Sequence, residues 1–328
     1  MERNRRSKKN KVQFNQIVAS AEIKQWGSFL SSNQNKNLLI RFLVSEWKSE
    51  NYRSKIGGKE FFVACEEKTF KISENDVEEI QELGSNHEEA DTRMALHVQD
   101  ANNNFEHVLV ASPDTDVFII LLSISSVLNS NMYFLTGVKD SRRIIDVTQV
   151  GNNMMDTLNP KGVDREQLMK SLIGFHSFTG CDTISAFAGK GKVKPLKLMV
   201  NNLKYLEAFS KLGEQQTIDD DLMNSLLAFV CHMYGWKETI LVNEVRYRMY
   251  CQSGGKVACE KLPPCESVVR LHAMRANYQA YIWRQSLLQY QDEMDPTEHG
   301  WLIDIDGNLD IKWMDCNPAP DEVRVKQM

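Results

Sequence analysis

Residues 107–122 read HVLVASPDTDVFIILL, which is a strand pattern, a polar turn and an apolar helix pattern in succession. The run His107–Ala111 is short and rich in valine, whereas Val117–Leu128 is apolar over helical length. Further strand patterns follow at Met132–Leu135 and at Arg143–Val147. Strands separated by such helices form crossover units, in which the strands run parallel beneath covering helices. The sequence therefore predicts an α/β fold with a parallel sheet.

The rest of the chain is organised around this segment. Helical spacing of apolar residues marks Asn35–Trp47, and Glu60–Ile72 is typical of two short strands around a turn. A helix is predicted at Glu88–Gln99, and four more at Leu168–Phe178, Leu196–Leu212, Leu222–Tyr234 and Ser267–Tyr290. The stretch WLIDIDGNLDIKW predicts a hairpin that turns at Asp306-Gly307. The predicted regions are a basic disordered tail (1–12), an N-terminal helix with short strands (13–80), an α/β core (81–205), a helical extension (206–291), and a hairpin with a tail (292–328).

Composition limits the class of protein. Of 328 residues, 42% are hydrophobic and 25% charged, which suits a folded core and excludes a disordered or fibrous chain. The formal net charge of −5 gives no overall attraction to nucleic acid, so any affinity for phosphate must come from local patches. Apolar runs such as Val117–Leu122 are far shorter than the ~20 residues of a membrane-spanning helix. We therefore expect a soluble protein without a membrane partner.

The N-terminal sequence MERNRRSKKNKV is a block of basic residues with no apolar stretch behind it, which argues against a secretory signal. A solvated tail, a nuclear-import signal and a phosphate-binding arm all have this composition. Seven scattered cysteines without framework spacing fit a reducing compartment. We expect an intracellular location, with the nucleus as the compartment to which the basic block would direct the chain.

Carboxylates stand where predicted strands meet predicted helices. They are Glu88, Glu89 and Asp91 in HEEADTR, Asp114 and Asp116 in SPDTDV, and Asp182 in FTGCDT. Ligands of parallel α/β sheets bind at the carboxyl ends of the strands, which is the predicted place of Asp114 and Asp116. Acids that share a site repel one another unless a cation neutralises them. Each cluster alone is also typical of a helix N-cap or a first-turn acid.

Four short motifs occur in order along the chain. They are Glu89-Ala90-Asp91, Ser112-Pro113-Asp114-Thr115-Asp116, Gly180-Cys181-Asp182 and Gly189-Lys190-Gly191-Lys192. In this order and at these separations they resemble the PIN-like domains of the flap endonuclease and 5′ nuclease superfamily. HEEADTR, SPDTDV and FTGCDTISAFAGKGK are also similar to segments of uncharacterised, transposon-associated animal proteins that carry this domain. The resemblance covers residues 80–205 well and implies a PIN-like parallel-sheet core there.

The resemblance implies a metal-dependent nuclease. In the family, acids hold two metal ions that hydrolyse a phosphodiester bond. On this chain Glu89 and Asp91 would serve the first ion, and Asp114, Asp116 and Asp182 the second, as catalytic residues and metal ligands. Oxygen ligands favour Mg²⁺ or Mn²⁺. The implied activity is structure-specific endo- or exonucleolytic cleavage of DNA, with RNA as the alternative substrate.

A lysine-rich turn follows the last acid. Lys190, Lys192 and Lys194 lie in a stretch without carboxylates, and Gly189 and Gly191 would let backbone N–H groups approach a phosphate. By resemblance this segment is a DNA-binding hairpin that contacts the phosphate backbone without regard to base sequence. A solvated loop before a helix has the same composition.

One departure from the family leaves two functions open. The family's sheet begins with a central strand that carries an Asp ligand, and this chain has no Asp before Asp76. A first strand and two ligands therefore have no counterpart in the sequence. The alternative to an active nuclease is a catalytically inactive PIN-like domain that binds nucleic acid or a protein. His176 and Cys181 are interpreted as core packing around the Asp182 turn rather than as a base and a nucleophile.

Overall fold

The computed structural model describes residues 14–158 and 162–315. Its central sheet has the order β4 (His107–Ala111), β5 (Asn131–Thr136), β6 (Arg143–Asp146). The strands β4 and β5 run parallel and are joined by helix α6 (Thr115–Ile124), as a crossover requires. The predicted basic tail of residues 1–12 and the chain beyond residue 315 lie outside the described residues.

The α/β class is confirmed, but the predicted parallel sheet is limited to one parallel pair. Strand β6 lies antiparallel to β5. The connection from Thr136 to Arg143 holds only the short turn η2 (Lys139–Ser141), which is too short for a crossover. Within the described ranges β4 pairs with β5 alone, and the Leu109 side chain is 53% exposed. A first strand beside β4 is therefore absent from the part of the chain that the structure describes.

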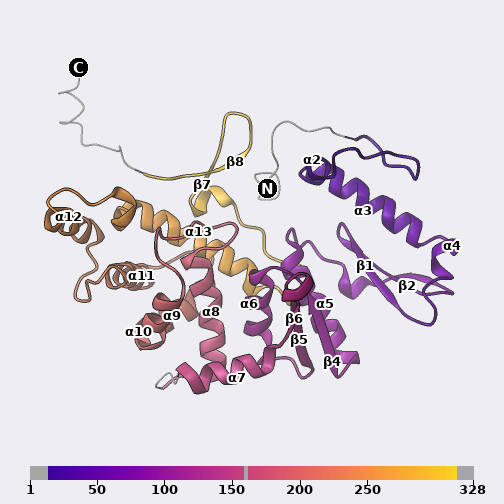
Figure 1. Cartoon of the computed structure of the whole chain (residues 1–328), viewed down its shortest axis with the longest axis horizontal. Coiled ribbons are helices and arrows are strands. Elements are labelled where there is room, and N and C mark those ends of the chain that lie inside the picture. The colour runs from indigo at the N-terminus through magenta and orange to yellow at the C-terminus, as the bar shows by residue number, and fades with distance from the viewer. Residues whose placement is uncertain (1–13, 159–161, 316–328) are drawn as a thin grey trace.

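The helices form a layer around α8, as Figure 1 shows. Helix α8 (Arg165–Thr179) is buried over most of its length and packs against α6, α10 and α13. The other helices of this half are α5 (Ala90–Asn104), α7 (Val147–Leu158), α9 (Val193–Val200), α10 (Leu203–Lys211), α11 (Asp220–Met233), α12 (Val242–Gln252), the 3-10 turn η3 (Cys259–Lys261) and α13 (Glu266–Arg284). The single helix predicted at Leu196–Leu212 is two helices, because the Asn202 side chain caps a new helix by accepting from the Lys204 N–H.

The N-terminal region contains the predicted helix and short strands, and the C-terminal part contains the predicted hairpin. The helices α2 (Trp26–Leu30), α3 (Asn33–Trp47) and α4 (Glu50–Arg53) precede an antiparallel sheet of β1 (Phe61–Cys65), β2 (Lys68–Ile72) and β3 (Val77–Glu79), followed by η1 (Gln81–Leu83). The C-terminal part holds η4 (Pro296–His299) and a hairpin of β7 (Trp301–Ile303) and β8 (Leu309–Ile311). Gly307 adopts a φ of 78°, as the predicted turn requires.

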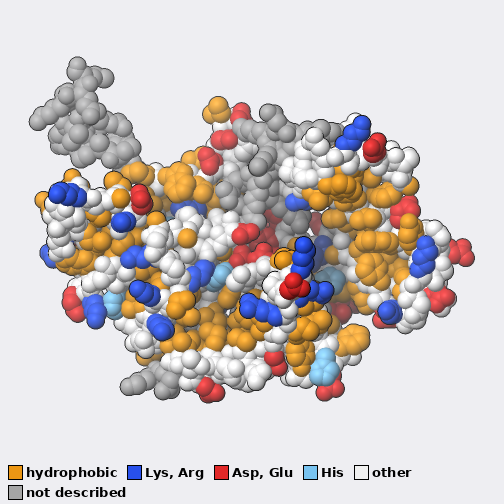
Figure 2. Space-filling model, viewed as in Figure 1, with side chains coloured by type: hydrophobic (Ala, Val, Ile, Leu, Met, Phe, Trp, Pro, Cys, Tyr) orange, Lys and Arg blue, Asp and Glu red, His pale blue; other side chains and the backbone are white. Residues whose placement is uncertain are grey.

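Charged side chains of both signs are spread over the face drawn in Figure 2. Several acidic side chains gather near its middle, with Lys and Arg side chains beside them. None of the helices in the described ranges is long and apolar enough to cross a membrane.

Candidate functional site

The end of β4 positions two of the predicted acids. The Ser112 hydroxyl accepts a hydrogen bond from the Asp114 N–H at 3.1 Å, and the Asp114 carboxylate accepts from the Asp116 N–H at 2.9 Å. Asp114 is thus the N-cap of α6, and Asp116 lies in its first turn, where a helix favours negative charge. The local sequence therefore explains why both carboxylates stand at the carboxyl end of β4.

The end of α8 brings in the third acid from a distant part of the chain. The helix ends at Gly180, whose φ of 112° suits glycine. A Cβ at this position would lie 2.7 Å from the Ala186 Cβ, so the turn closes only with glycine here. Asp182 follows directly, and Lys192 returns to the same place at the end of the turn.

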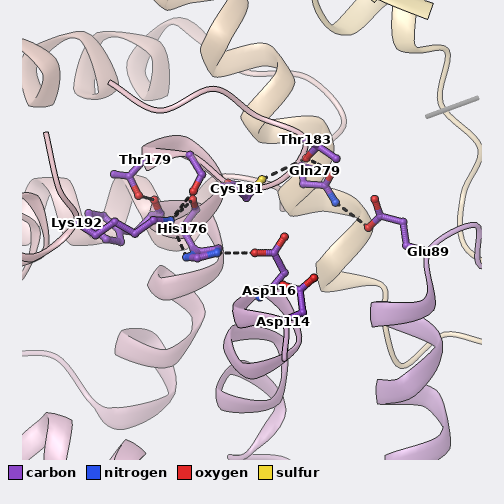
Figure 3. A network of polar contacts seen from close by, with 12 residues as sticks. Glu89, Asp114, Asp116, His176, Thr179, Cys181, Thr183, Lys192 and Gln279 are labelled. Carbon is purple, nitrogen blue, oxygen red and sulfur yellow. Dashed lines mark hydrogen bonds and ion pairs between the residues drawn. The ribbon is translucent and has the colours of Figure 1, made fainter. Parts of the chain in front are cut away.

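A buried relay of three side chains joins the two segments (Figure 3). The Asp116 carboxylate lies 2.8 Å from His176 Nε2, and Lys192 Nζ lies 2.8 Å from His176 Nδ1. Lys192 Nζ also donates to the carbonyl oxygens of His176 at 3.1 Å and Gly180 at 2.6 Å. An ammonium only donates, so Nδ1 accepts, and the ring proton lies on Nε2 and is donated to Asp116. The relay thus holds one Asp116 oxygen in a fixed position.

Burial shifts the pKa of Lys192, which belongs to the relay, and that of Cys181. Desolvation lowers the pKa of Lys192 to about 8, against a weaker upward effect of Cys181 and Asp116. Desolvation raises the pKa of the Cys181 thiol to about 11, so this sulfur is protonated at neutral pH. Cys181 is therefore not a ready nucleophile.

The buried Lys192 should make the free energy of unfolding rise with pH between about 8 and 10.5. Its pKa in the folded chain, about 8, lies below the ordinary 10.5, so the unfolded chain binds more protons in between. The free energy of unfolding of the wild type, minus that of Lys192→Met, should increase from pH 8 to pH 10.5. Urea unfolding of both proteins at several pH values measures this difference. Lys197→Met, at an exposed position, is the control for the loss of a lysine. A flat line for Lys192→Met would contradict the buried ammonium.

One cavity collects three of the five predicted acids. It has a volume of about 530 Å³, and its polar lining includes Asp114, Asp116, His176, Cys181, Asp182 and Lys192. We call it the acid cavity. Its three carboxylates face a single lysine, so the charge within it is negative. His176 and Cys181 also line it, although the sequence interpretation took both for core packing. No local pattern links His176 to Asp116, which lies sixty positions away.

The other two predicted acids lie outside the acid cavity. A chain of hydrogen bonds runs from Cys181 through the Thr183 hydroxyl, which donates to Gln279 at 2.7 Å, to Glu89, which accepts from the Gln279 amide at 3.1 Å (Figure 3). Glu89 lines a different cavity, and Asp91 lies in the first turn of α5 and lines neither. Gln279, on α13, was not predicted, since it is 190 residues away from Glu89.

The ligand atoms of the acid cavity suit a metal ion by their chemical type, but not by their arrangement. Carboxylate oxygens and a negative cavity suit Mg²⁺ or Mn²⁺. In the described part of the chain, however, no group of three or more His, Cys, Asp or Glu side chains is arranged to hold an ion. One oxygen of Asp116 is also engaged by His176. The acid cavity fits a divalent cation by donor type and charge, but not by an assembled set of ligands.

Residues of the same segment also line a second cavity. It has a volume of about 600 Å³ and is lined by Gly189, Lys190, Gly191 and Lys194 together with His232, Gly235 and Lys237 from the end of α11. We call it the basic cavity. A Cβ on Gly189 or Gly191 would meet nothing within 4 Å, so their backbone faces open space. Lys190 Nζ donates to the Met233 carbonyl at 3.1 Å and lies 4.0 Å from the centre of the Tyr234 ring.

Four of the five residues predicted to bind DNA thus share the basic cavity, and Lys192 points instead into the acid cavity. His232 and Lys237 were not predicted to take part, because only the packing of α11 against α9 brings them there.

Compared with protein-family models, with curated proteins and with solved structures, the chain matches none.

Proposed function

We propose that this protein binds the phosphate backbone of nucleic acid, DNA foremost, in the basic cavity and hydrolyses a phosphodiester bond at the acid cavity with Mg²⁺ or Mn²⁺. One observation carries the proposal. The segment from Gly180 to Lys194 supplies four residues, Asp182 and Lys192 among them, to the acid cavity and five residues to the basic cavity. A phosphate held by the one would place its neighbouring bond near the carboxylates of the other.

The basic cavity has the chemistry of a phosphate site. Lysine ammonium groups and open glycine backbone suit a phosphate without reading its base. Desolvation by burial, and then the charge of Lys194, lower the pKa of Lys190. A bound phosphate would offset the repulsion between Lys190 and Lys194, because its negative charge attracts both ammonium groups.

The acid cavity would supply the ligands for the cation. Asp114, Asp116 and Asp182 offer carboxylate oxygens, and a bound divalent cation would act as a Lewis acid on a phosphate oxygen. His176 and Lys192 would fix the orientation of Asp116 through the relay. The similarity of the acid motifs to those of 5′ nucleases supports this assignment, and Glu89 and Asp91 belong to it only by that resemblance.

The alternative is an inactive PIN-like module that binds nucleic acid or a protein without cleavage. Two observations favour it: the described residues hold no assembled metal group, and Asp116 is already engaged by His176. It differs from the nuclease in a measurable way, since a divalent cation then neither supports cleavage nor raises the melting midpoint.

The test combines cleavage with thermal unfolding of the full chain. End-labelled flap, hairpin and single-stranded DNA are incubated with Mg²⁺, Mn²⁺ or EDTA, and melts are recorded under the same conditions. We expect cleavage with metal only and a melting midpoint that rises with Mn²⁺ concentration, because the ion binds the folded state. The inactive module would be established instead if the chain bound DNA in EDTA, and if Mg²⁺ and Mn²⁺ produced neither cleavage nor a rise in the melting midpoint.

A matched pair of variants separates the two cavities. Lys190→Gln with Lys194→Gln should weaken DNA binding and reduce its salt dependence, yet keep the Mn²⁺ shift of the melt. Asp182→Asn should reduce the Mn²⁺ shift and keep DNA binding. Loss of both properties in either variant would contradict the division of roles.

A further inference from the structure

Helix α12 presents two tyrosines to solvent. The helix packs against α11 at the end of the molecule opposite the N-terminal sheet (Figure 1). Its inner side carries the buried Val242 and Val245, with Met249 packed against the core beside them. Tyr247 is 68% exposed and Tyr250 is 49% exposed, and a spacing of three residues puts both on one side of the helix. We call these two residues the tyrosine face. Two large rings side by side at the surface suit contact with another molecule.

A stacked guanidinium connects α12 to the basic cavity. Arg248, the neighbour of Tyr247, places its guanidinium over the Trp236 ring, 5.4 Å from the ring centre, and pairs with Glu244. Trp236 stands between Gly235 and Lys237, which both line the basic cavity. In the described part of the chain, α11 and α12 contribute no lining residue to the acid cavity. The tyrosine face therefore extends the surface of the basic cavity at its α11 end.

The charge of these segments favours an anionic partner. Residues 183–206, which supply most of the lining of the basic cavity, hold five lysines and no Asp or Glu. Residues 235–263, which include α12, hold five basic residues against three acidic ones, although the whole chain carries a net charge of −5. Single-stranded nucleic acid matches this combination, because its phosphates need cations and its unpaired bases offer flat faces to aromatic rings.

We propose that the tyrosine face stacks unpaired bases of a nucleic-acid strand whose phosphates lie in the basic cavity. This inference rests on the proposed function, since the lysines of the basic cavity supply the contacts to the backbone. It adds a preference for single strands, because the bases of a duplex are already stacked on one another. The preference is independent of base sequence, since every base has a π face.

Binding of two labelled DNAs tests this proposal. A fluorescein-labelled single strand of mixed sequence, and the duplex that it forms with its complement, are titrated with the full chain in EDTA, and anisotropy is recorded. Tyr247→Leu with Tyr250→Leu should weaken binding of the single strand at least about tenfold and binding of the duplex less than about twofold. Tyr247→Phe with Tyr250→Phe keeps both rings and should bind the single strand as the wild type does.

Two further comparisons identify the kind of contact. Tyr52→Leu with Tyr290→Leu makes the same change at two exposed tyrosines outside the tyrosine face and should leave both affinities unchanged. Stacking involves no counterion release, so the leucine pair at positions 247 and 250 should keep the salt dependence of the wild type. Lys190→Gln with Lys194→Gln should reduce that dependence instead. Melts and sedimentation of each variant verify its folding and its oligomeric state.

Failure of this inference can be told apart from failure of the proposed function. If binding of the single strand depends on Lys190 and Lys194 but is unchanged in the leucine pair, the tyrosine face takes no part and the proposed function stands. If the wild type binds neither DNA, both fail. Equal weakening of single-strand and duplex binding in the leucine pair would overturn the stacking of unpaired bases. A wild-type dimer that the leucine pair converts to a monomer would also overturn it, because the rings would then lie between two copies of the chain.

Discussion

Replacing Asp114 and Asp116 together with asparagine should lower metal-dependent DNA cleavage at least about a hundredfold and leave the chain folded. The substitution removes two negative charges from the acid cavity but keeps the local hydrogen bonds. Asparagine is as good an N-cap as aspartate, and an amide oxygen at position 116 can still accept from His176. Initial cleavage rates with Mn²⁺, compared at equal melting midpoints, measure the effect.

The choice of asparagine rather than alanine follows from the structure. Mutual repulsion alone predicts that removing both acids stabilises the metal-free chain. Asp114→Ala, however, loses a helix cap worth about 1 kcal/mol, and Asp116→Ala leaves the His176 N–H buried without its acceptor, at a cost of about 1–3 kcal/mol. We therefore expect the alanine pair to lower the metal-free melting midpoint.

A second capping aspartate provides the control. Asp219 caps α11 as Asp114 caps α6, accepting from the Leu222 N–H at 2.7 Å, and it lines none of the cavities described here. Asp219→Asn should leave cleavage unchanged. If Asp114→Asn with Asp116→Asn cleaved DNA as fast as Asp219→Asn does, the acid cavity would not be the active site.

Phe209→Ala should destabilise the protein by about 3–5 kcal/mol. Phe209 is completely buried on α10, with ring centres 5.6 Å from Phe175, 5.6 Å from Phe178 and 4.8 Å from Phe229. Truncation would leave a cavity among these rings, and the neighbours cannot close it without moving α8. Urea unfolding monitored by circular dichroism gives the free energy of unfolding for both proteins.

An exposed phenylalanine of the same chain provides the control for Phe209→Ala. Phe105 is 59% exposed at the end of α5, so Phe105→Ala should cost much less, on the order of 0.5 kcal/mol. Since α8 carries His176 and ends at the Gly180 turn, Phe209→Ala should also reduce the Mn²⁺ shift of the melt. Equal destabilisation by the two substitutions would contradict the packing around α8.

The predictions from local pattern were confirmed where one segment decides its own structure. The strand His107–Ala111 has the predicted bounds, and the N-terminal helix and the hairpin at Asp306-Gly307 lie where they were expected. Helix α7 was missed, although Val147, Val150, Met154 and Leu158 recur at helical spacing. The direction of β6 was wrong, because strand direction depends on the connection rather than on the strand's own residues.

The sequence by itself determined the α/β class, the capped turn that presents Asp114 and Asp116, and the glycine-rich turn after Asp182. Each depends on interactions within a few residues: a β-branched run, an Asp N-cap, a glycine at positive φ. Only the tertiary structure decided which acids meet. It brings Asp182, His176 and Lys192 to Asp116, and it turns Glu89 toward Gln279 and a different pocket. The physical reason is that these contacts join residues sixty or more positions apart through the packing of α8 and α13, and side-chain periodicity carries no information about such distances.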